Sequence, residues 1–288
     1  MTGITSILCG IKEAYRQWRL VLTIYFIMTM MALTIGLQVY QVVEASIGHS
    51  IKLETLAQRF DYTIWRDFLN IHGASLSPLF GQLRWHILAF LVTSIFVHGG
   101  TLSNIRFNRT RWKDFWSGGA QYFGPFAGIS LLYLVILLIW TMIIWMPFIP
   151  NLFPMIERFD RESPVIWILC ALAIIWILGI GFLYSSSIFS RLAYMSLRRS
   201  VFSCIKFGMV YTSRKLKTSY FILAALLLSL VLIYFVNHGL VLWLGISSAA
   251  LLLFFVIIQQ LFVIIKIWLR VASMAALNTV LDERDYQD

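Results

Sequence analysis

Charged residues are scarce in this sequence, and their scarcity excludes an ordinary water-soluble protein. Only 12% of the 288 residues are charged, whereas soluble domains contain about 25%. Hydrophobic residues make up 60% of the chain, and its mean hydropathy is +0.81. So little polar surface cannot keep a chain of this length in water, and we therefore expect lipid to surround most of it.

Acidic residues and cysteines are also few. The chain has 13 Asp and Glu against 23 Lys and Arg, which gives a formal charge of +10. In a soluble protein this excess would suggest a nucleic-acid partner. Here the bases lie between apolar runs, which is typical of membrane topology, so no nucleic-acid partner is expected. The three cysteines, Cys9, Cys170 and Cys204, are too far apart to suggest a metal site or a disulfide framework.

Six apolar runs are long enough to cross the hydrocarbon core, which requires about 20 helical residues. Backbone groups in lipid must be paired within their own segment, so these runs are predicted to be helices. The sequence therefore predicts an all-α fold, a polytopic membrane bundle of six transmembrane helices with short interfacial amphipathic helices. We expect an amphipathic helix over residues 1–19, an outer helical loop over 44–84, and spans at residues 20–43, 85–105, 122–149, 164–190, 219–236 and 240–265.

Lys and Arg are distributed unevenly between alternate connections. The residues before the first span, those at 106–113 and 191–217, and those after the last span together contain 17 of them. The intervening connections contain 6. Because positive residues are retained on the inner side of the membrane, both termini are expected in the cytoplasm.

Two segments outside the spans show helical periodicity with basic residues beside it. Before the first span, apolar residues recur at steps of three and four from Ile4 to Trp18, which predicts a helix in the inner headgroup layer. The connection over 191–217 contains no acid. Its seven bases are predicted to contact the anionic inner leaflet, with a cytoplasmic partner as the alternative; they are Arg191, Arg198, Arg199, Lys206, Arg214, Lys215 and Lys217.

The six predicted spans contain no Asp, Glu, Lys or Arg. Enzymes and ion-coupled carriers that act within a membrane need reactive or ion-binding groups at depth. We therefore expect no catalytic residue, no cofactor and no metal site. The histidines are not at the spacings typical of zinc ligands.

The most unusual intramembrane sequence is His98-Gly99-Gly100. Two adjacent glycines permit either a close helix crossing or a broken helix that binds a ligand. Gly124 and Gly128 on the third span are candidates for the other half of a close crossing. Gln259 and Gln260 are the second candidate, and interhelical hydrogen bonding is favoured for them over a transport pathway.

Several short segments along the chain carry a resemblance to a known group. They are Arg19-Leu-Val-Leu22, Gly48-His-Ser50, Phe60-Asp61, Val97-His-Gly-Gly100 and the helical sequence Trp112–Gly119 that leads to Tyr122-Phe123. With these features the chain resembles a group of uncharacterised bacterial six-helix integral membrane proteins. More distantly, it is similar to the membrane domain found beside some glycerophosphodiester phosphodiesterases. The resemblance implies a location in the bacterial cytoplasmic membrane and assigns no functional residue.

Two functions agree with these observations. The first is a non-catalytic assembly, scaffold or accessory component of the membrane, which would meet a protein partner at the outer loop 44–84 or at the loop 191–217. The alternative is a passive transporter of lipid or another apolar solute with a passage between the helices. We favour the first, because the spans lack charge and the connections are large enough to meet a partner.

Overall fold

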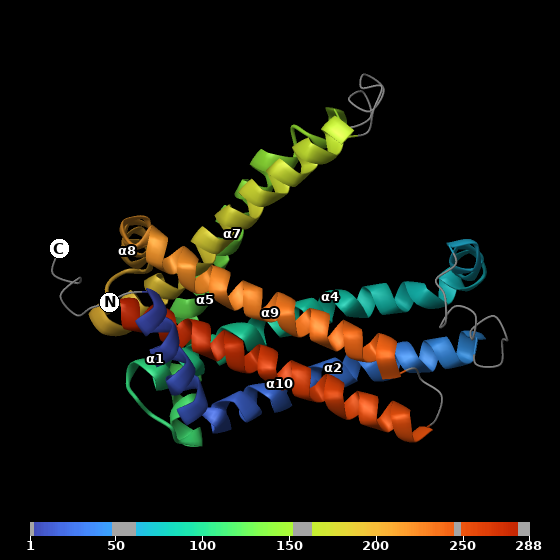
Figure 1. Ribbon diagram of the computed structural model, residues 1–288, viewed down its shortest axis with the longest axis horizontal. Coiled ribbons are helices and arrows are strands. Elements are labelled where there is room, and N and C mark those ends of the chain that lie inside the picture. The colour runs from blue at the N-terminus through green and yellow to red at the C-terminus, as the bar shows by residue number, and fades with distance from the viewer. Residues whose placement is uncertain (1–2, 48–61, 152–162, 245–248, 282–288) are drawn as a thin grey trace. The chain divides into compact units, whose positions relative to one another are not determined.

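The computed structural model describes residues 3–47, 62–151, 163–244 and 249–281. Within these ranges the chain forms α-helices and one short 3-10 helix, and no strand (Figure 1). The helices are α1 (Gly3–Arg16), α2 (Trp18–Ile47), α4 (Tyr62–Arg106), α5 (Trp112–Trp145), α7 (Ser163–Leu197), α8 (Val201–Arg214), α9 (Leu216–Leu244) and α10 (Ala249–Val280), with η1 at Ile149–Asn151. The predicted all-α fold is confirmed.

Six of the described helices contain a segment long and apolar enough to cross a membrane. These segments are Trp18–Gln41, Gly81–Arg106, Trp112–Trp145, Pro164–Leu197, Leu216–Leu240 and Leu253–Val280. The predicted polytopic bundle of six spans is therefore confirmed, and the chain is a multi-pass integral membrane protein.

The chain divides into two compact units. Unit 1 comprises Met1–Leu22 and Ile95–Asp288, and unit 2 comprises Thr23–Ser94. The described residues of unit 2 are most of α2 and the N-terminal part of α4. Helix α4 begins at Tyr62, so the second half of the outer loop is helical, whereas residues 48–61 of that loop lie outside the described residues.

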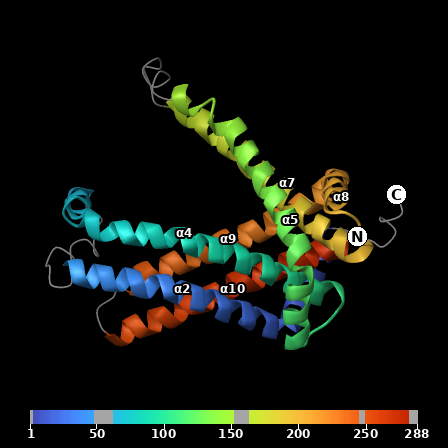
Figure 2. The ribbon, with the colours of Figure 1, turned by 180° about the vertical axis from the view of Figure 1, so that it is seen from behind.

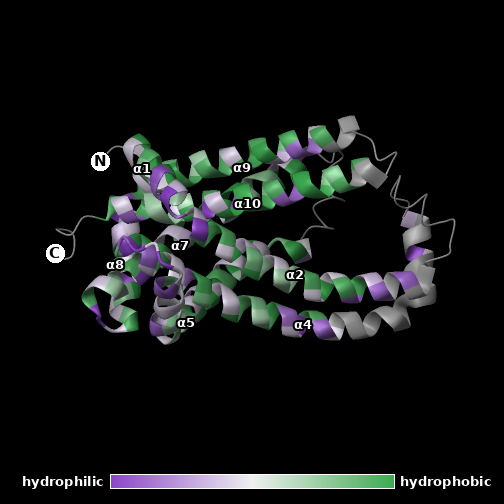
Figure 3. Ribbon diagram, turned by 90° about the horizontal axis from the view of Figure 1, so that it is seen from below, coloured by the Kyte–Doolittle hydropathy of each residue, from purple (hydrophilic) through white to green (hydrophobic). Residues whose placement is uncertain are grey.

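Unit 1 contains α1, α5 and α7–α10. Helix α5 packs against α7, and α9 packs against α10; Figures 1 and 2 show each pair side by side. Helix α1 packs along α10, and α8 packs on α7. We call the surface formed by α1, α8 and the adjoining ends of α4, α5 and α10 the terminal face. Figure 3 shows that hydrophilic residues gather at α1 and α8, while α9 and α10 are mostly hydrophobic.

Several helix boundaries differ from those expected from the sequence. The apolar segment of α10, Leu253–Val280, begins and ends later than the expected span 240–265, so Lys266 and Arg270 lie within it. Helix α7 continues past Ser190 to Leu197, and α9 continues through residues 237–239 to Leu244. Helix α5 runs unbroken from Trp112 through Gly118 and Gly119, so the expected interfacial helix is the first part of the third span. In each case one polar or glycine residue near the expected boundary contacts a neighbouring helix, so the helix has no need to end there; these residues are Arg191, Asn237 and Gly118.

Candidate functional site

A cluster of buried polar side chains joins α5, α7 and α8 in unit 1. The Tyr133 hydroxyl on α5 lies 2.5 Å from Ser186 Oγ and 2.9 Å from Ser190 Oγ on α7. Ser190 Oγ also donates to the Ser186 carbonyl at 2.8 Å. Gly208 of α8 packs against the same turn, and a Cβ at this position would collide with Ser190 and the Ser186 carbonyl. The cluster therefore holds three helices together at close range.

Arg191 extends this cluster into the interior. The residue is only 7% exposed. One guanidinium nitrogen donates to Ser130 Oγ at 2.9 Å, and the guanidinium carbon lies 5.7 Å from the centre of the Phe126 ring. Its Nε is buried and has no hydrogen-bond partner among the described residues. The prediction that Arg191 contacts the inner leaflet is therefore wrong, because α7 continues to Leu197 and directs this side chain into unit 1.

A second cation, Arg270, comes from α10. Its guanidinium donates to His98 Nε2 on α4 at 3.1 Å. The Tyr184 hydroxyl of α7 lies 3.1 Å from Ser273 Oγ, which is one turn further along α10. Among the described residues, the like charge of Arg270 acts on Arg191, and no carboxylate does. Ionisable residues in a membrane span are rare and usually functional, so this pair is a candidate site for an anion.

Helix α4 runs without a break through Gly99 and Gly100. A Cβ at Gly100 would lie 2.6 Å from the Phe115 carbonyl oxygen, and one at Gly99 would lie 3.4 Å from the Gly118 carbonyl oxygen. On the other side, a Cβ at Gly118 would lie 2.6 Å from Ser103 Cβ. The glycines therefore permit α4 and α5 to cross closely, and in this geometry they contact protein rather than a ligand.

The partner glycines differ from those expected. Gly124 has open space at the position of a Cβ, and the nearest atoms to Gly128 belong to Val201 at 3.8 Å. The close crossing instead uses Gly118 and Gly119, whose helical register faces α4. Gly118 and Gly119 can contact α4 because α5 is a continuous helix through both of them.

The two candidates for a broken-helix or packing site, His98-Gly99-Gly100 and Gln259-Gln260, lie apart in the structure. Gln259 Nε2 donates to Asn237 Oδ1 at 2.9 Å, and Asn237 Nδ2 donates to Gln259 Oε1 at 3.3 Å. This reciprocal pair joins α9 to α10; Gln260 also interacts within the described part of the chain. The partner of His98, Arg270, lies eleven residues beyond Gln259 on α10, which is about 16 Å along a helix axis.

Helix α1 is fixed to α10 by its small residues. Ser6, Gly10 and Ala14 are buried, and a Cβ at Gly10 would lie 2.6 Å from the Ala272 carbonyl oxygen and 2.8 Å from Ala276 Cβ. The predicted apolar stripe, which continues to Trp18 at the start of α2, faces mostly away from the protein. Ile7 is half-buried, and the other members are exposed; they are Ile4, Leu8, Ile11, Tyr15 and Trp18. Helix α1 therefore packs on the bundle with one face and leaves a separate apolar face exposed.

Helix α8 has a different outer surface. Its buried residues face α7 and the rest of unit 1; they are Cys204, Ile205, Gly208, Tyr211 and Thr212. Tyr211 donates to the Val280 carbonyl at 2.7 Å and so also connects α8 to α10. On the outer side, the row with four-residue spacing alternates between apolar and basic side chains, all exposed; it consists of Phe202, Lys206, Val210 and Arg214.

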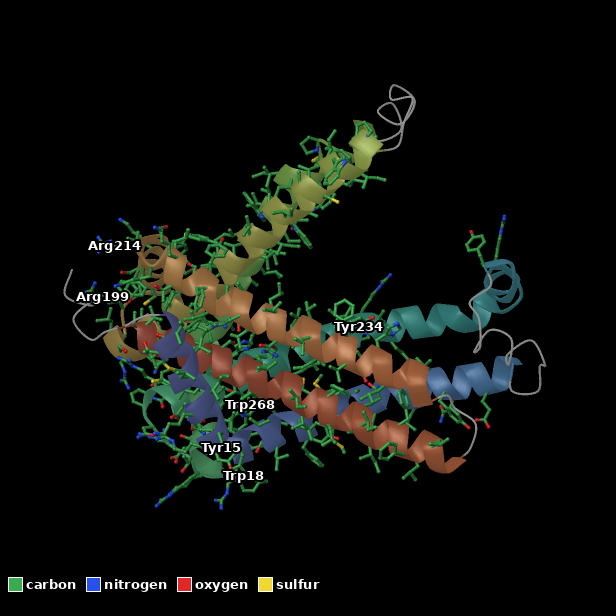
Figure 4. All side chains as sticks on the ribbon, viewed as in Figure 1. Tyr15, Trp18, Arg199, Arg214, Tyr234 and Trp268 are labelled. Carbon is green, nitrogen blue, oxygen red and sulfur yellow. The ribbon has the colours of Figure 1, made fainter. Side chains whose placement is uncertain are left out.

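Six of the seven predicted leaflet contacts are exposed, namely Arg198, Arg199, Lys206, Arg214, Lys215 and Lys217. They surround α8, and Figure 4 shows Arg199 and Arg214 beside this helix, apart from Tyr15 near the end of α1 and Trp18 at the start of α2. The exposure leaves these bases available to a charged surface. Their contact with the leaflet stays a prediction.

Cys204 is the buried thiol of α8, and it donates to the Arg199 carbonyl at 3.8 Å. Burial raises the pKa of this thiol, and the nearby Arg199 charge and the carbonyl bond offset that rise only in part. Because the thiolate is the reactive form, burial lowers the reactivity of Cys204. Cys9 on α1 and Cys170 on α7 are free and exposed.

Cavities open at the terminal face on both sides of Trp18. The larger, of about 880 Å³, lies between α1, α10 and the end of α4 and is lined by Lys12, Glu13, Arg16, Asn108 and Asn278 among others. Within it, Arg16 is bound to Glu13 at 2.6 Å and to the Asn108 side chain. The smaller, of about 530 Å³, is lined by Trp18, Arg19, Leu22, Arg111 and Trp112.

The described residues contain no group of three or more His, Cys, Asp or Glu side chains arranged to hold a metal ion. Searches of protein-family models, curated proteins and solved structures found no match to this chain. The functional argument therefore rests on the residues of the chain itself.

Two features of the site differ from the sequence-based expectation, although the sequence contains a signal for each. Arg191 follows Tyr184 and Ser187 at steps of three and four on one helical face. That polar stripe indicates an inward direction for Arg191, in contrast to the surface bases around it. The small face of α1, with Ser6, Gly10 and Ala14 at four-residue spacing, likewise indicates a close helix contact.

Proposed function

We propose that this protein is a non-catalytic assembly or accessory component of the bacterial cytoplasmic membrane. Both termini and the terminal face lie in the cytoplasm in this proposal. The excess of Lys and Arg on the connections at this face supports that orientation. An even number of spans agrees with termini on the same side.

The observation that carries the proposal is the mixed outer row of α8. A helix that lies in a membrane surface separates its apolar residues from its basic residues. In the outer row of α8 the two kinds alternate: Phe202 is 74% exposed and Val210 is 44% exposed, and Lys206 lies between them. A protein partner with apolar and acidic side chains would satisfy both kinds of residue along this row at once.

Helix α1 shows the arrangement that is expected of a helix on a membrane surface, in contrast to α8. Its apolar residues occupy one exposed stripe, and Lys12, Arg16 and Arg19 lie beside that stripe. This separation suits the inner headgroup layer. The two helices of the terminal face thus serve different neighbours, with α1 on lipid and α8 on a protein. The other predicted contact for a partner, the outer loop 44–84, lies partly outside the described residues.

The test is purification of the tagged protein from its native membrane in a mild detergent, followed by mass spectrometry of the proteins that accompany it. We expect a stoichiometric partner that is lost from a Phe202→Asp, Val210→Asp variant. The matched control is Leu131→Ala, Leu228→Ala, which alters exposed apolar residues on α5 and α9 instead. Purification without any stoichiometric protein, or loss of the partner from both variants equally, would contradict the proposal.

The second candidate is passage of a lipid or another apolar solute, and one observation favours it. Arg191 and Arg270 are two cations in span ends, and no carboxylate is among their described hydrogen-bond partners, so together they could bind the anionic group of an amphiphile. Liposomes that contain the protein and a fluorescent anionic phospholipid test this function. Transfer that depends on Arg191 supports it, and equal transfer by an Arg191→Gln variant counts against it.

A further inference from the structure

The smaller cavity at the terminal face, which we call the Trp18 groove, combines two segments far apart in the sequence. Trp18, Arg19 and Leu22 come from the start of α2, and Arg111 and Trp112 come from the start of α5. All five residues belong to unit 1. A volume of about 530 Å³ is within the range of small-ligand sites, which is about 300–1,000 Å³.

The charge in this groove is positive. Arg19 and Arg111 line it, and no acidic residue does. The neighbouring cavity is different, because Glu13 lies in it and forms an ion pair with Arg16 at 2.6 Å. Arg111 precedes α5 without capping that helix through its side chain, so its guanidinium is available to another group. A guanidinium donates paired N–H bonds and phosphate oxygens accept them, so a phosphate suits the charge of this groove.

The aromatic residues identify the depth at which the groove lies. Trp18 is 55% exposed and Trp112 is 59% exposed, and tryptophans in such positions lie at the headgroup level of a bilayer. Arg19 lies 5.7 Å from the centre of the Trp18 ring, so the cation and the indole form one surface. Leu22 is 41% exposed and follows Trp18 by one helical turn toward the membrane interior. The groove therefore changes from basic to apolar along α2.

We propose that the Trp18 groove binds one anionic phospholipid through its phosphate-bearing headgroup. In this site Arg19 and Arg111 donate to the phosphate oxygens, Trp18 and Trp112 lie on either side of the headgroup, and the first part of an acyl chain follows Leu22. Only a ligand with a charged head and an apolar tail satisfies both ends of the groove. The site is independent of the proposed assembly function, since α8 contributes none of its residues.

Native mass spectrometry of the full chain in detergent micelles tests the site. The protein is titrated with phosphatidylglycerol and, separately, with phosphatidylcholine of the same chain length. We expect one phosphatidylglycerol to be retained in preference to phosphatidylcholine. The Arg19→Gln, Arg111→Gln variant should retain it roughly thirty-fold more weakly, on the basis of about 1 kcal/mol for each base near an anionic lipid surface.

The matched control is Arg109→Gln, Lys266→Gln, which removes the same charge from exposed positions that do not line the groove. We expect this control to retain phosphatidylglycerol as the unaltered chain does, and Arg19→Lys, Arg111→Lys to retain it better than the glutamine variant. Inorganic phosphate added in excess should not displace the lipid, because it lacks the tail. Equal losses in the two glutamine variants, equal retention of both lipids by the unaltered chain, or displacement by free phosphate would overturn the proposal. The lipid comparison on the unaltered chain decides the matter even if a variant does not fold.

Discussion

Docking of α1 onto α10 depends on the absence of a side chain at Gly10. A Cβ at this position would lie 2.6 Å from the Ala272 carbonyl oxygen and 2.8 Å from both Ala276 Cβ and Ala276 N. Two of these three atoms belong to the backbone, so they cannot move away as the end of a flexible side chain does. A Gly10→Ala substitution must therefore push α1 away from α10.

The expected size of the effect follows from two opposing terms. Alanine in place of glycine favours an isolated helix by about 1 kcal/mol. Overpacking a closely packed contact costs about 1–3 kcal/mol. Because two of the clashing atoms here belong to the backbone, the upper part of that range applies, about 2–3 kcal/mol. The difference shifts the docking equilibrium of α1 toward the undocked state by about 1–2 kcal/mol. This corresponds to a factor of about 5–30 in the ratio of undocked to docked states.

Hydrogen exchange in lipid nanodiscs measures this equilibrium directly. Exchange of the α1 amides should become about 5–30-fold faster in Gly10→Ala, by the same arithmetic. Gly36→Ala is the control, because Gly36 is a helical glycine and a Cβ added there would have no atom within 4 Å; it should leave α1 unchanged. Unchanged exchange of α1 in the Gly10→Ala protein would refute the close contact between α1 and α10.

Three further predictions concern unit 1. Gly100→Ala should lower the stability of the protein by about 1–3 kcal/mol, because the added methyl group would collide with Phe115. Gly124→Ala should have no such effect, because the space around Gly124 is open. A thermal-shift assay compares the two variants, and equal melting temperatures would argue against the close crossing. A double-mutant cycle of Asn237→Ala and Gln259→Ala in the membrane should give a coupling energy of about 0.6 kcal/mol. A coupling energy of zero would contradict the hydrogen-bonded amide pair between α9 and α10. In single-cysteine proteins, maleimide should modify the exposed Cys9 rapidly at neutral pH and the buried Cys204 slowly. The raised pKa of Cys204 means that its thiolate, the form that reacts, is produced only at higher pH. Equal rates at neutral pH would contradict the burial of Cys204.

Hydropathy is sufficient to predict the six spans, because lipid imposes a length and an apolar composition on every helix that crosses it. It is not sufficient for the helix boundaries at Ser190 and Val236. Whether Arg191 or Asn237 ends a helix depends on a partner on another helix, here Ser130 and Gln259. A single sequence does not identify such partners.

The surface of each interfacial helix is predictable only in part. The periodicity of α1 correctly identifies one apolar stripe, but it does not tell which face packs on the bundle. The stripe from Ile4 to Trp18 is exposed, and the small residues around Gly10 make the contact instead. In a soluble protein the large apolar side chains would be buried first. In a membrane they gain as much from lipid as from protein, so close packing of small residues decides which face docks.

The central claim, that the outer row of α8 contacts a protein, is tested most directly by site-specific photo-crosslinking in living cells. A photoreactive amino acid replaces Phe202 on α8 in one strain and Leu131 on α5 in another, both highly exposed positions at 74% and 63%. We predict a discrete protein adduct from position 202 and only lipid adducts from position 131. Lipid adducts alone from position 202 would contradict an assembly function at this surface.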